Sequence, residues 1–461
     1  MKVCKFGGSS LADAGQLSKV MDIVAADPAR RIVVVSAPGK RFPGDTKTTD
    51  LLISLAKAAI DGEDAAAPLA AVVERYASIA KDLALGEECV AAIEADLRGR
   101  LAKCGGLAPE EATDLVKAAG EDNCAKLVAA AFNARGRKAR YASPRETGMI
   151  LKGSFGDATL DESSYALLSK AFSDFDGIVV YPGFFGYTRD GRVATFPRGG
   201  SDITGSILAA AVRADVYENF TDVDSVYPVD PRVVPEVSRG IPEMTYKEMR
   251  ELAYAGFGVF ADEAVVPAVR ARIPINIRNT NRPERPGTMI VQSRRVSPGS
   301  LVGVAADDGF CSIVVEKYLM NRELGFGRRL LQIVESEGVS YEHVPSGVDT
   351  QCVVVRESNL PKEKERRIVQ KIRRELQPDD VRVDRDISIL MVVGAGMSQT
   401  PGMLGRTFNA LATAGVSVSM VNSGSSEVSI MIAIKPEDRV KAVQALYKEF
   451  FAAGGEAAED A

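Results

Sequence analysis

The feature that most constrains the fold is a series of short apolar segments that alternate with segments of helical periodicity. Two of them, RIVVVS at 31–36 and GIVVYP at 177–182, are almost continuously apolar, as is typical of strands buried on both faces of a parallel sheet. Further strands are predicted at 2–6, 139–142, 216–221 and 274–278. Helices are predicted at 10–25, 47–60, 65–118, 124–134, 203–212, 246–255 and 263–272. The alternation predicts an α/β domain in which helices sandwich a mainly parallel central sheet.

The last third of the chain carries an internal repeat. Gly338-Val339-Ser340 recurs as Gly415-Val416-Ser417, and Ser346-Gly347 recurs as Ser423-Gly424, each time 77 residues later. Each copy has the pattern of a strand, a glycine-containing turn, an amphipathic helix and two further strands. Chance similarity is the alternative for so few matched positions, but the constant spacing favours two consecutive small α+β modules of one design.

Composition narrows the function classes. A chain of 461 residues exceeds one ordinary core, so several domains are expected. The net charge of −5 argues against a general nucleic-acid binder. The sequence shows neither a signal-peptide pattern nor an apolar run of about 18 residues, so no membrane partner is expected. The six cysteines are scattered without CxxC spacing, which indicates thiols in a reducing compartment, and the cytoplasm is the expected location.

The single histidine, His343, excludes several chemistries. Histidine-rich zinc sites and the HExxH motif of metalloproteases are not available to this chain. A Ser-His-Asp triad would have to use His343, which lies in YEHVPSG with no nucleophile elbow nearby and is expected to be a strand residue. Catalysis is therefore expected to depend on lysine, arginine, carboxylates and backbone N–H groups.

The N-terminal segment KFGGSS, at 5–10, has the composition of an anion-binding turn. If residues 2–6 form a strand and a helix starts at Ser10, Gly7 and Gly8 lie in the turn between them. Glycines let the backbone approach an anion closely, the helix offers free N–H groups, and Lys5 adds a full positive charge. The combination suits a polyphosphate, and a plain glycine turn is an equally compatible alternative.

A second glycine cluster, FPRGGSDITG at 196–205, repeats this arrangement. Arg198 offers a planar guanidinium group that suits a carboxylate or a phosphate. Asp202 is placed to cap a helix that starts near Ile203, which is the alternative to a functional role. Two such turns with adjacent cations in one α/β domain favour a binding site at the carboxyl ends of the strands.

A third segment, ENFTDVDSVYPVDPR at 218–232, follows a predicted strand. We interpret it as a nucleotide cradle in which Thr221 and Asp222 contact the base or the ribose, with a polar loop as the alternative. Two other phosphate motifs are rejected. No GxxxxGK[ST] occurs, and VVGAGMSQTPG at 392–402 lacks the third glycine of a dinucleotide fingerprint and lies inside the repeat.

Together these motifs closely resemble those of the aspartate kinases. The resemblance rests on KFGGSS, VVVSAPGK with TTDLL, GED, FPRGGSDITG and FTDVDSVYPVDPR, and it continues through ELAYAGFGVF and IPINIRNT. The C-terminal repeat, with MNRELGFGRRLLQIVE and YEHVPSGVD, is similar to the paired ACT regulatory modules of these enzymes. The resemblance implies the amino-acid-kinase fold at 1–294, with an aspartate-binding part followed by an ATP-binding part. It further implies ferredoxin-like ACT modules at 300–384 and 385–455 and a flexible tail at 456–461.

The resemblance also implies a reaction, the ATP-dependent phosphorylation of the side-chain carboxylate of L-aspartate to 4-phospho-L-aspartate. This is the first step toward lysine, threonine, methionine and diaminopimelate. Because a carboxylate is already ionised at pH 7, no histidine base is needed. Mg²⁺ is expected to accompany ATP, with no dedicated metal site on the protein. Glutamate 5-kinase and uridylate kinase are alternatives with the same fold, and a catalytically silent amino-acid sensor is the alternative from another class.

Residue roles follow from the matching motifs. The implied catalytic pair is Lys5, which would neutralise the phosphates, and Asp202, which would orient that lysine. The implied aspartate-binding residues are Thr49 (or the adjacent Thr48), Glu121 for the α-ammonium group, Arg198 for the α-carboxylate, and Ser201. The implied ATP-binding residues are Lys5, Gly7, Gly8, Ser9, Thr221, Asp222, Tyr227 and Arg232.

The ACT-like modules are implied to bind an inhibitory amino acid at a subunit interface. The implied residues are Met320, Asn321, Gly325, Phe326, Ser346, Val348 and Asp349. Lysine is the expected inhibitor, with threonine, or both together, as alternatives, and the expected assembly is a homo-oligomer that is at least a dimer. The sequence departs from the family pattern at Gly258 and Ala261-Asp262, which affects one nucleotide contact but not the reaction. SAPGKRFPGDTKTTD also carries an insertion that is expected to form a mobile loop near the substrate.

Overall fold

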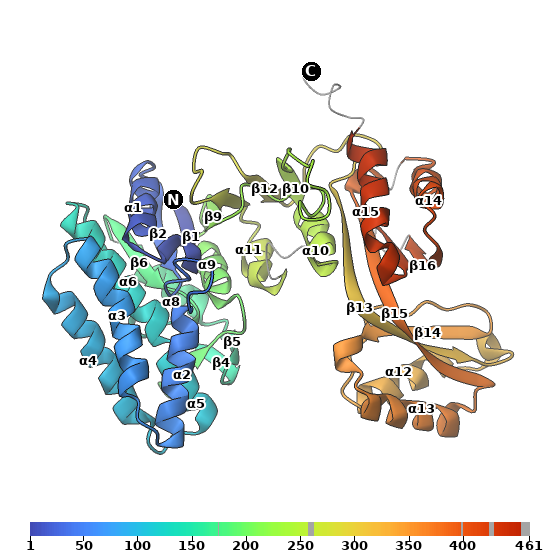
Figure 1. The fold of residues 1–461 in the computed structure, drawn as a ribbon, viewed down its shortest axis with the longest axis horizontal. Helices are drawn as coiled ribbons and strands as arrows, with labels where there is room; N and C mark the ends of the chain where they lie inside the picture. Colours follow the sequence, from blue (N-terminus) through green and yellow to red (C-terminus); the bar gives the residue numbers. More distant parts are fainter. Residues whose placement is uncertain (174, 257–261, 398–399, 424–427, 453–461) are drawn as a thin grey trace. The chain divides into compact units, whose positions relative to one another are not determined.

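The computed structural model describes residues 1–461 except 174, 257–261, 398–399, 424–427 and 453–461, and its chain forms two compact units (Figure 1). Unit 1 comprises Met1–Val226, Gly240–Tyr246 and Gly258–Arg294, and unit 2 comprises Tyr227–Arg239, Lys247–Phe257 and Arg295–Ala461. The departures at Gly258 and Ala261 and the predicted tail at 456–461 lie outside the described residues. In the part of the chain that is described, no helix combines the length and apolar character needed to cross a membrane.

Unit 1 is built on an eight-stranded sheet of order β10-β12-β11-β9-β1-β2-β6-β3. The strands are β1 (Lys2–Phe6), β2 (Arg30–Val35), β3 (Ala139–Tyr141), β6 (Ile178–Pro182), β9 (Val216–Thr221), β10 (Glu243–Thr245), β11 (Ile275–Asn279) and β12 (Thr288–Val291). Every neighbouring pair is parallel except β11 with β12. The prediction of a mainly parallel sheet is confirmed, and the short strands β10, at one edge, and β12, beside it, are additions to it.

Helices cover this sheet. The helices of unit 1 are α1 (Ala14–Ala25), α2 (Thr48–Asp61), α3 (Ala66–Asp82), α4 (Glu87–Cys104), α5 (Pro109–Lys117), α6 (Ala119–Ala134), α7 (Pro144–Thr147), α8 (Ser164–Ala171), α9 (Gly200–Ala211) and α11 (Val266–Arg270), whereas α10 (Tyr246–Tyr254) belongs to unit 2 except for its first residue. The predicted helical region at 65–118 is three helices, α3, α4 and α5, and α4 contacts both of the others. Two hairpins, β4 (Leu151–Ser154) with β5 (Asp157–Leu160) and β7 (Phe185–Tyr187) with β8 (Val193–Thr195), were not predicted.

Unit 2 contains a five-stranded antiparallel sheet of order β14-β13-β15-β17-β16. Its strands are β13 (Gly303–Glu316), β14 (Thr350–Arg356), β15 (Asp380–Val393), β16 (Val418–Ser423) and β17 (Ser429–Ile434), and its helices are α12 (Phe326–Ser336), α13 (Lys362–Leu376), α14 (Met403–Thr413) and α15 (Arg439–Tyr447). The strand pair β13 and β15, and the helix pairs α12 with α14 and α13 with α15, each start 77 residues apart. The repeat found in the sequence is therefore a repeat of structure.

The long strands β13 and β15 each serve two hydrophobic cores. Val304 and Leu390 belong to one core, whereas Ile313 and Val381 belong to the other. The ladder between the strands is interrupted after Asp307, where the register shifts. The predicted boundary at 384/385 thus falls within β15, because the modules share this strand.

Two segments that the sequence places within 1–294, residues 227–239 and 247–257, group with unit 2. Val229 and Val234 join the core that contains Val304. The carbonyl oxygen of Pro228 accepts a hydrogen bond of 2.7 Å from the N–H of Val304. Apolar burial and this hydrogen bond explain why residues 227–239 group with unit 2.

Candidate active site

The candidate site lies where four parallel strands of unit 1 end. The turns after β1, β2 and β6 are joined to neighbouring strands or turns by backbone hydrogen bonds. The N–H of Gly7 donates to Phe220 at the end of β9 (3.2 Å), and the N–H of Gly183 donates to Val35 at the end of β2 (2.9 Å). Because all four strands run in the same direction, the turns that follow them gather at one edge of the sheet.

Gly8 and Gly39 are needed because two turns touch. The N–H of Gly39 donates to the carbonyl oxygen of Gly8 at 2.8 Å. A Cβ atom added to Gly8 would lie 2.8 Å from the carbonyl oxygen of Ala37, and one added to Gly39 would lie 2.6 Å from the carbonyl carbon of Gly8. The turn of KFGGSS is therefore pressed against the turn after β2. Neither motif alone predicts this contact, because it joins two turns that are far apart in the sequence.

Lys5 and Asp202 form the central ion pair of the site. The Lys5 ammonium group lies 2.6 Å from Oδ1 of Asp202, and the Asn219 amide donates to the same oxygen at 2.7 Å. Strand register pairs Lys5 with Asn219, so both side chains leave the sheet on the face that α9 covers. Lys5 is buried, with 7% of its surface exposed.

The alternative of a helix cap for Asp202 is wrong. Helix α9 begins at Gly200, with Gly199 as its N-cap in a left-handed conformation (φ 84°). Asp202 therefore lies within the first helical turn, and its carboxylate is turned to Lys5. Its place near a helix N-terminus also favours the negative charge.

Ser201 and Arg198 flank this start of α9. Ser201 is buried against Gly183, where an added Cβ would lie 2.6 Å from the Ser201 hydroxyl oxygen. Arg198 is exposed and precedes the helix by two residues. The two predicted substrate-binding residues therefore lie on the same turn as Asp202.

Glu121 is a buried carboxylate with unused hydrogen-bonding capacity. It lies in the first turn of α6, and within the described residues its Oε2 atom has no hydrogen-bond partner. Burial raises its pKa to about 7, opposed by backbone N–H groups of Ala37 and Glu121 and by the charges of Lys117 and Lys5. An incoming ammonium group would satisfy the free oxygen and restore the charge.

The structure leaves the choice between Thr48 and Thr49 open. Thr48 is fully buried, and its hydroxyl oxygen lacks a partner among the described residues, whereas Thr49 is half-buried. Both begin α2, and the N–H of Thr48 donates to Pro38 (3.3 Å) in the turn after β2. The position fits a role beside the substrate, and the assignment stays a prediction.

The inserted loop between β2 and α2 is tied down by Arg75 of α3. The Arg75 guanidinium donates to the carbonyl oxygens of Gly39 (2.6 Å) and Thr46 (2.8 Å) and pairs with Asp45 (2.9 Å). Arg41 binds the same Asp45 carboxylate at 2.9 Å. The Arg41 hydrogen bonds, assisted by Arg75, hold the pKa of Asp45 well below its usual range.

The predicted nucleotide residues are divided between the units. Ser9 is exposed beside Gly7 and Gly8, Thr221 ends β9, and Asp222 follows it as an exposed residue. Tyr227 and Arg232 belong to unit 2, where Arg232 pairs with Asp230 at 2.8 Å. The nucleotide roles of all these residues stay predictions.

The predicted effector residues lie on two adjoining loops of unit 2. The carboxylate of Asp349 accepts from the N–H of Leu319 at 2.8 Å, and the N–H of Lys317 donates to the Asp349 carbonyl at 2.9 Å. These bonds join the loop that contains Ser346 and Val348 to the loop that contains Asn321 and Gly325. Met320 and Phe326 are buried in the module core, so they offer backbone groups rather than side chains to a ligand.

Sequence reasoning missed several residues that shape the site. Asn219, Arg75, Gly39 and Gly183 hold Asp202, the inserted loop or Ser201, as described above. The sequence carried a signal for Gly39, as part of SAPGK, and for Gly183, as part of YPGFFG, because both turns follow predicted strands. The others act across strand or helix contacts that only the fold reveals.

Comparisons with known proteins agree with this geometry. A model of the amino acid kinase family matches residues 1–279, and a model of the ACT domain matches residues 390–450. Aspartokinase 3 of Bacillus subtilis (strain 168) is 51% identical over 452 residues, which cover 98% of this chain and 99% of that protein. The chain belongs to the aspartokinases of the amino acid kinase family.

Solved structures of this family share its fold. An aspartate kinase of Clostridium acetobutylicum, described as an allosteric enzyme, is 35% identical with a TM-score of 0.86, covering 98% of this chain and 100% of that one. E. coli aspartokinase III, solved in complex with aspartate and ADP, is 24% identical with a TM-score of 0.78. The match covers 98% of this chain and 100% of that one. The predictions of an amino-acid-kinase fold with ACT modules and of a kinase that acts on aspartate are confirmed.

Proposed function

We propose that this aspartokinase transfers the γ-phosphoryl group of ATP to the side-chain carboxylate of L-aspartate, using the site around Lys5. The observation that carries the proposal is the ion pair between buried Lys5 and half-buried Asp202 at the ends of the strands. Glu121, which has a free carboxylate oxygen, lies near enough for the positive charge of Lys5 to lower its pKa. One cation for phosphate and one anion for an amino group are what ATP and aspartate require.

The reaction follows from these charges. A carboxylate oxygen of aspartate forms a bond to the γ-phosphorus, the bond from that phosphorus to the bridging oxygen breaks, and ADP leaves with the electron pair. No proton has to move, because the attacking carboxylate is ionised at neutral pH. Lys5, held in place by Asp202 and Asn219, neutralises charge on the transferring group. Gly7, Gly8 and Ser9 supply backbone and hydroxyl donors to the phosphates.

The substrate is positioned by residues from three elements. Glu121 of α6 binds the α-ammonium group of aspartate, and Arg198 and Ser201 at the start of α9 bind the α-carboxylate. Thr49, or Thr48 beside it, contacts the substrate from α2. Fixing both substrate termini aligns the side-chain carboxylate with the phosphoryl group.

ATP is expected to bring Mg²⁺, which neutralises the phosphate charge when bound. Among the described residues, no three His, Cys, Asp or Glu side chains gather into a metal-binding group. Asp202 is already engaged by Lys5 and Asn219. The donor set therefore suits a metal held chiefly by nucleotide oxygens, with Thr221, Asp222, Tyr227 and Arg232 reserved for the nucleotide itself.

Feedback inhibition by an amino acid, with lysine preferred over threonine, is the second part of the proposal. Its support is the pair of adjoining loops around Asp349, which combine a carboxylate with the left-handed Gly325 before α12. The loops expose Leu324 and Val348, whose apolar surfaces suit a contact between subunits. The boundaries 1–294, 300–384, 385–455 and 456–461, a homo-oligomer of at least two chains and a cytoplasmic location complete this proposal.

A direct assay tests the proposal. The purified chain with Mg-ATP should release ADP only when L-aspartate is added, and not with L-glutamate or UMP, the substrates of the same-fold alternatives. A silent sensor would bind lysine without any turnover. Full activity of Lys5→Ala would overturn the proposed role of the site, and lysine or threonine should lower the rate of the wild type.

A further inference from the structure

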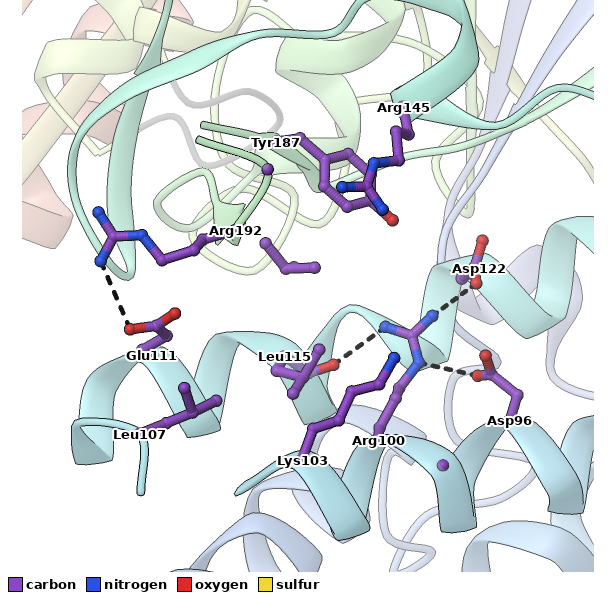
Figure 2. A pocket seen from close by; sticks show the side chains of 13 residues that line it. Asp96, Arg100, Lys103, Leu107, Glu111, Leu115, Asp122, Arg145, Tyr187 and Arg192 are labelled. Carbon is purple, nitrogen blue, oxygen red and sulfur yellow. Dashed lines mark hydrogen bonds and ion pairs between the residues drawn. The ribbon is translucent and has the colours of Figure 1, made fainter. Parts of the chain in front are cut away.

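A second cluster of charged side chains in unit 1 shares no residue with the predicted aspartate and ATP sites. It lines a cavity of about 460 Å³, a size typical of small-molecule sites (Figure 2). One wall carries Arg100 and Lys103 of α4, and the facing wall carries Arg145 of α7, Tyr187 of β7 and Arg192. The two walls face each other across open space.

The three carboxylates that line the cavity are already paired. Arg100 binds Asp96 at 2.8 Å and Asp122 at 2.6 Å, and it also donates to a backbone carbonyl of α5 at 3.0 Å (Figure 2). Arg192 lies 3.5 Å from Glu111. Lys126 pairs with the same two aspartates, at 3.7 Å from Asp96 and 2.9 Å from Asp122, so the two aspartates share two cations and Glu111 has its own.

Lys103 and Arg145 are the cations that remain. Neither forms an ion pair with any residue that the structure describes, and no hydrogen bond is formed by either charged group within that part of the chain. The Arg145 guanidinium lies 5.3 Å from the Tyr187 ring centre, and one of its nitrogens is 2.7 Å from where a Cβ on Gly191 would be. Glycine at 191 thus leaves room for the guanidinium against the cavity wall.

We propose that this cavity binds a small dianion, carrying carboxylate or phosphate groups, between Lys103 and Arg145. Two unneutralised cations on facing walls match two negative charges, and the planar fork of arginine suits either group. Leu107, Leu115 and Val193 give the cavity an apolar surface for a short carbon chain. A second cavity of about 470 Å³ shares Arg145, Tyr187 and Gly191, so the ligand has room to extend.

Isothermal titration of the full chain with inorganic phosphate, and separately with succinate, tests the proposal at low ionic strength. The wild type should bind at least one of them, and the responding probe tells a phosphate site from a dicarboxylate site. Lys103→Gln/Arg145→Gln should weaken binding at least tenfold, about 1.4 kcal/mol. Arg145→Lys keeps the charge but loses the fork, so its affinity should be intermediate.

Two control variants locate the bound anion. Arg98→Gln/Lys152→Gln removes the same net charge from exposed positions outside the cavity, and its affinity should match the wild type. Lys5→Ala/Arg198→Gln removes the cations of the candidate active site, so any anion held there is lost and the binding that remains in this variant belongs to the cavity. The readout needs no turnover, so it is independent of the proposed function.

Several outcomes would overturn the site. These are no binding of either probe up to about 10 mM, equal affinity in Lys103→Gln/Arg145→Gln, and loss of binding in either control. Lys103 and Arg145 are exposed and unpaired within the described residues, so their replacement is not expected to disturb folding. A melting temperature measured by circular dichroism for each variant verifies this.

Discussion

The two charged clusters of unit 1 differ in how their cations are held. At the strand ends, Lys5 is buried and paired with Asp202, and Asn219 shares the same carboxylate oxygen. In the cavity lined by α4, α7 and the β7–β8 hairpin, Lys103 and Arg145 are exposed and have no ionic partner among the described residues. The first cluster is preorganised around a fixed charge, whereas the second offers charges that a ligand would have to order.

Burial explains why the first cluster suits catalysis. A buried ionic group is weakly screened, so its charge acts strongly on a transferring phosphoryl group. The same burial destabilises any charge that lacks a partner, as the raised pKa of Glu121 illustrates. Exposed cations pay no such penalty, and they provide affinity without a comparable electrostatic effect.

Replacing Lys5 with alanine gives the largest expected effect. The variant removes the only side-chain cation that the described residues place against Asp202, so kcat should fall by about 10³ or more. Aspartate-dependent ADP release measures this, and Lys81→Ala, an exposed lysine at the end of α3, serves as the control. A loss of less than about tenfold would place the phosphoryl-neutralising charge elsewhere.

Glu121→Gln should be the next most damaging change. Without the carboxylate, a buried substrate ammonium group lacks a counter-charge, which costs about 3–5 kcal/mol and raises the KM for aspartate more than 100-fold. In the wild type, kcat/KM for aspartate should rise as the pH increases through about 7, because only ionised Glu121 attracts the ammonium group. Glu94→Gln at an exposed ion pair is the control. A flat pH profile together with an unchanged KM would exclude Glu121 as the ammonium site.

The same substitution should stabilise the folded chain at alkaline pH. Burial raises the pKa of Glu121 from 4.5 to about 7, so between these values the folded state keeps a proton that the unfolded state has released. Stability contributed by protonated Glu121 is therefore lost as the pH rises through this window. At pH 8 the neutral glutamine should be more stable by about 3 kcal/mol, a difference that disappears near pH 4. Urea unfolding at both pH values measures it, and a destabilised variant at pH 8 would contradict the assigned burial cost.

The comparison also shows what the sequence can predict. The strands β1 and β9 were predicted with their observed bounds, because apolar runs and glycine turns are local signals. The 77-residue repeat reappears in the starts of β13 and β15. The hairpins β4–β5 and β7–β8 were missed, since strands of three or four residues carry too little periodicity.

The site was predictable where one motif carries both position and chemistry. Lys5 and Asp202 belong to two such motifs, and their pairing follows from α9 covering β1. The contribution of Asn219 depends on strand register, which no local pattern specifies. The cavity with Lys103 and Arg145 was missed entirely, because it joins helices and hairpins whose sequences look like ordinary solvated surfaces.

The smallest predicted effect tests whether the first cluster extends beyond its strand ends. Arg75→Met removes the hydrogen bond to the carbonyl oxygen of Gly39, whose N–H in turn donates to Gly8. The turn that contains Gly7 and Gly8 should then be held less firmly against the phosphates, and kcat should fall about tenfold. Arg41→Met is the matched control, because Arg41 binds the same Asp45 carboxylate but forms no hydrogen bond to Gly39. Steady-state kinetics with both substrates distinguish the variants. If the two lose activity equally, the shared contact with Asp45 is what matters, and the bond to Gly39 plays no separate part in holding the glycine turn.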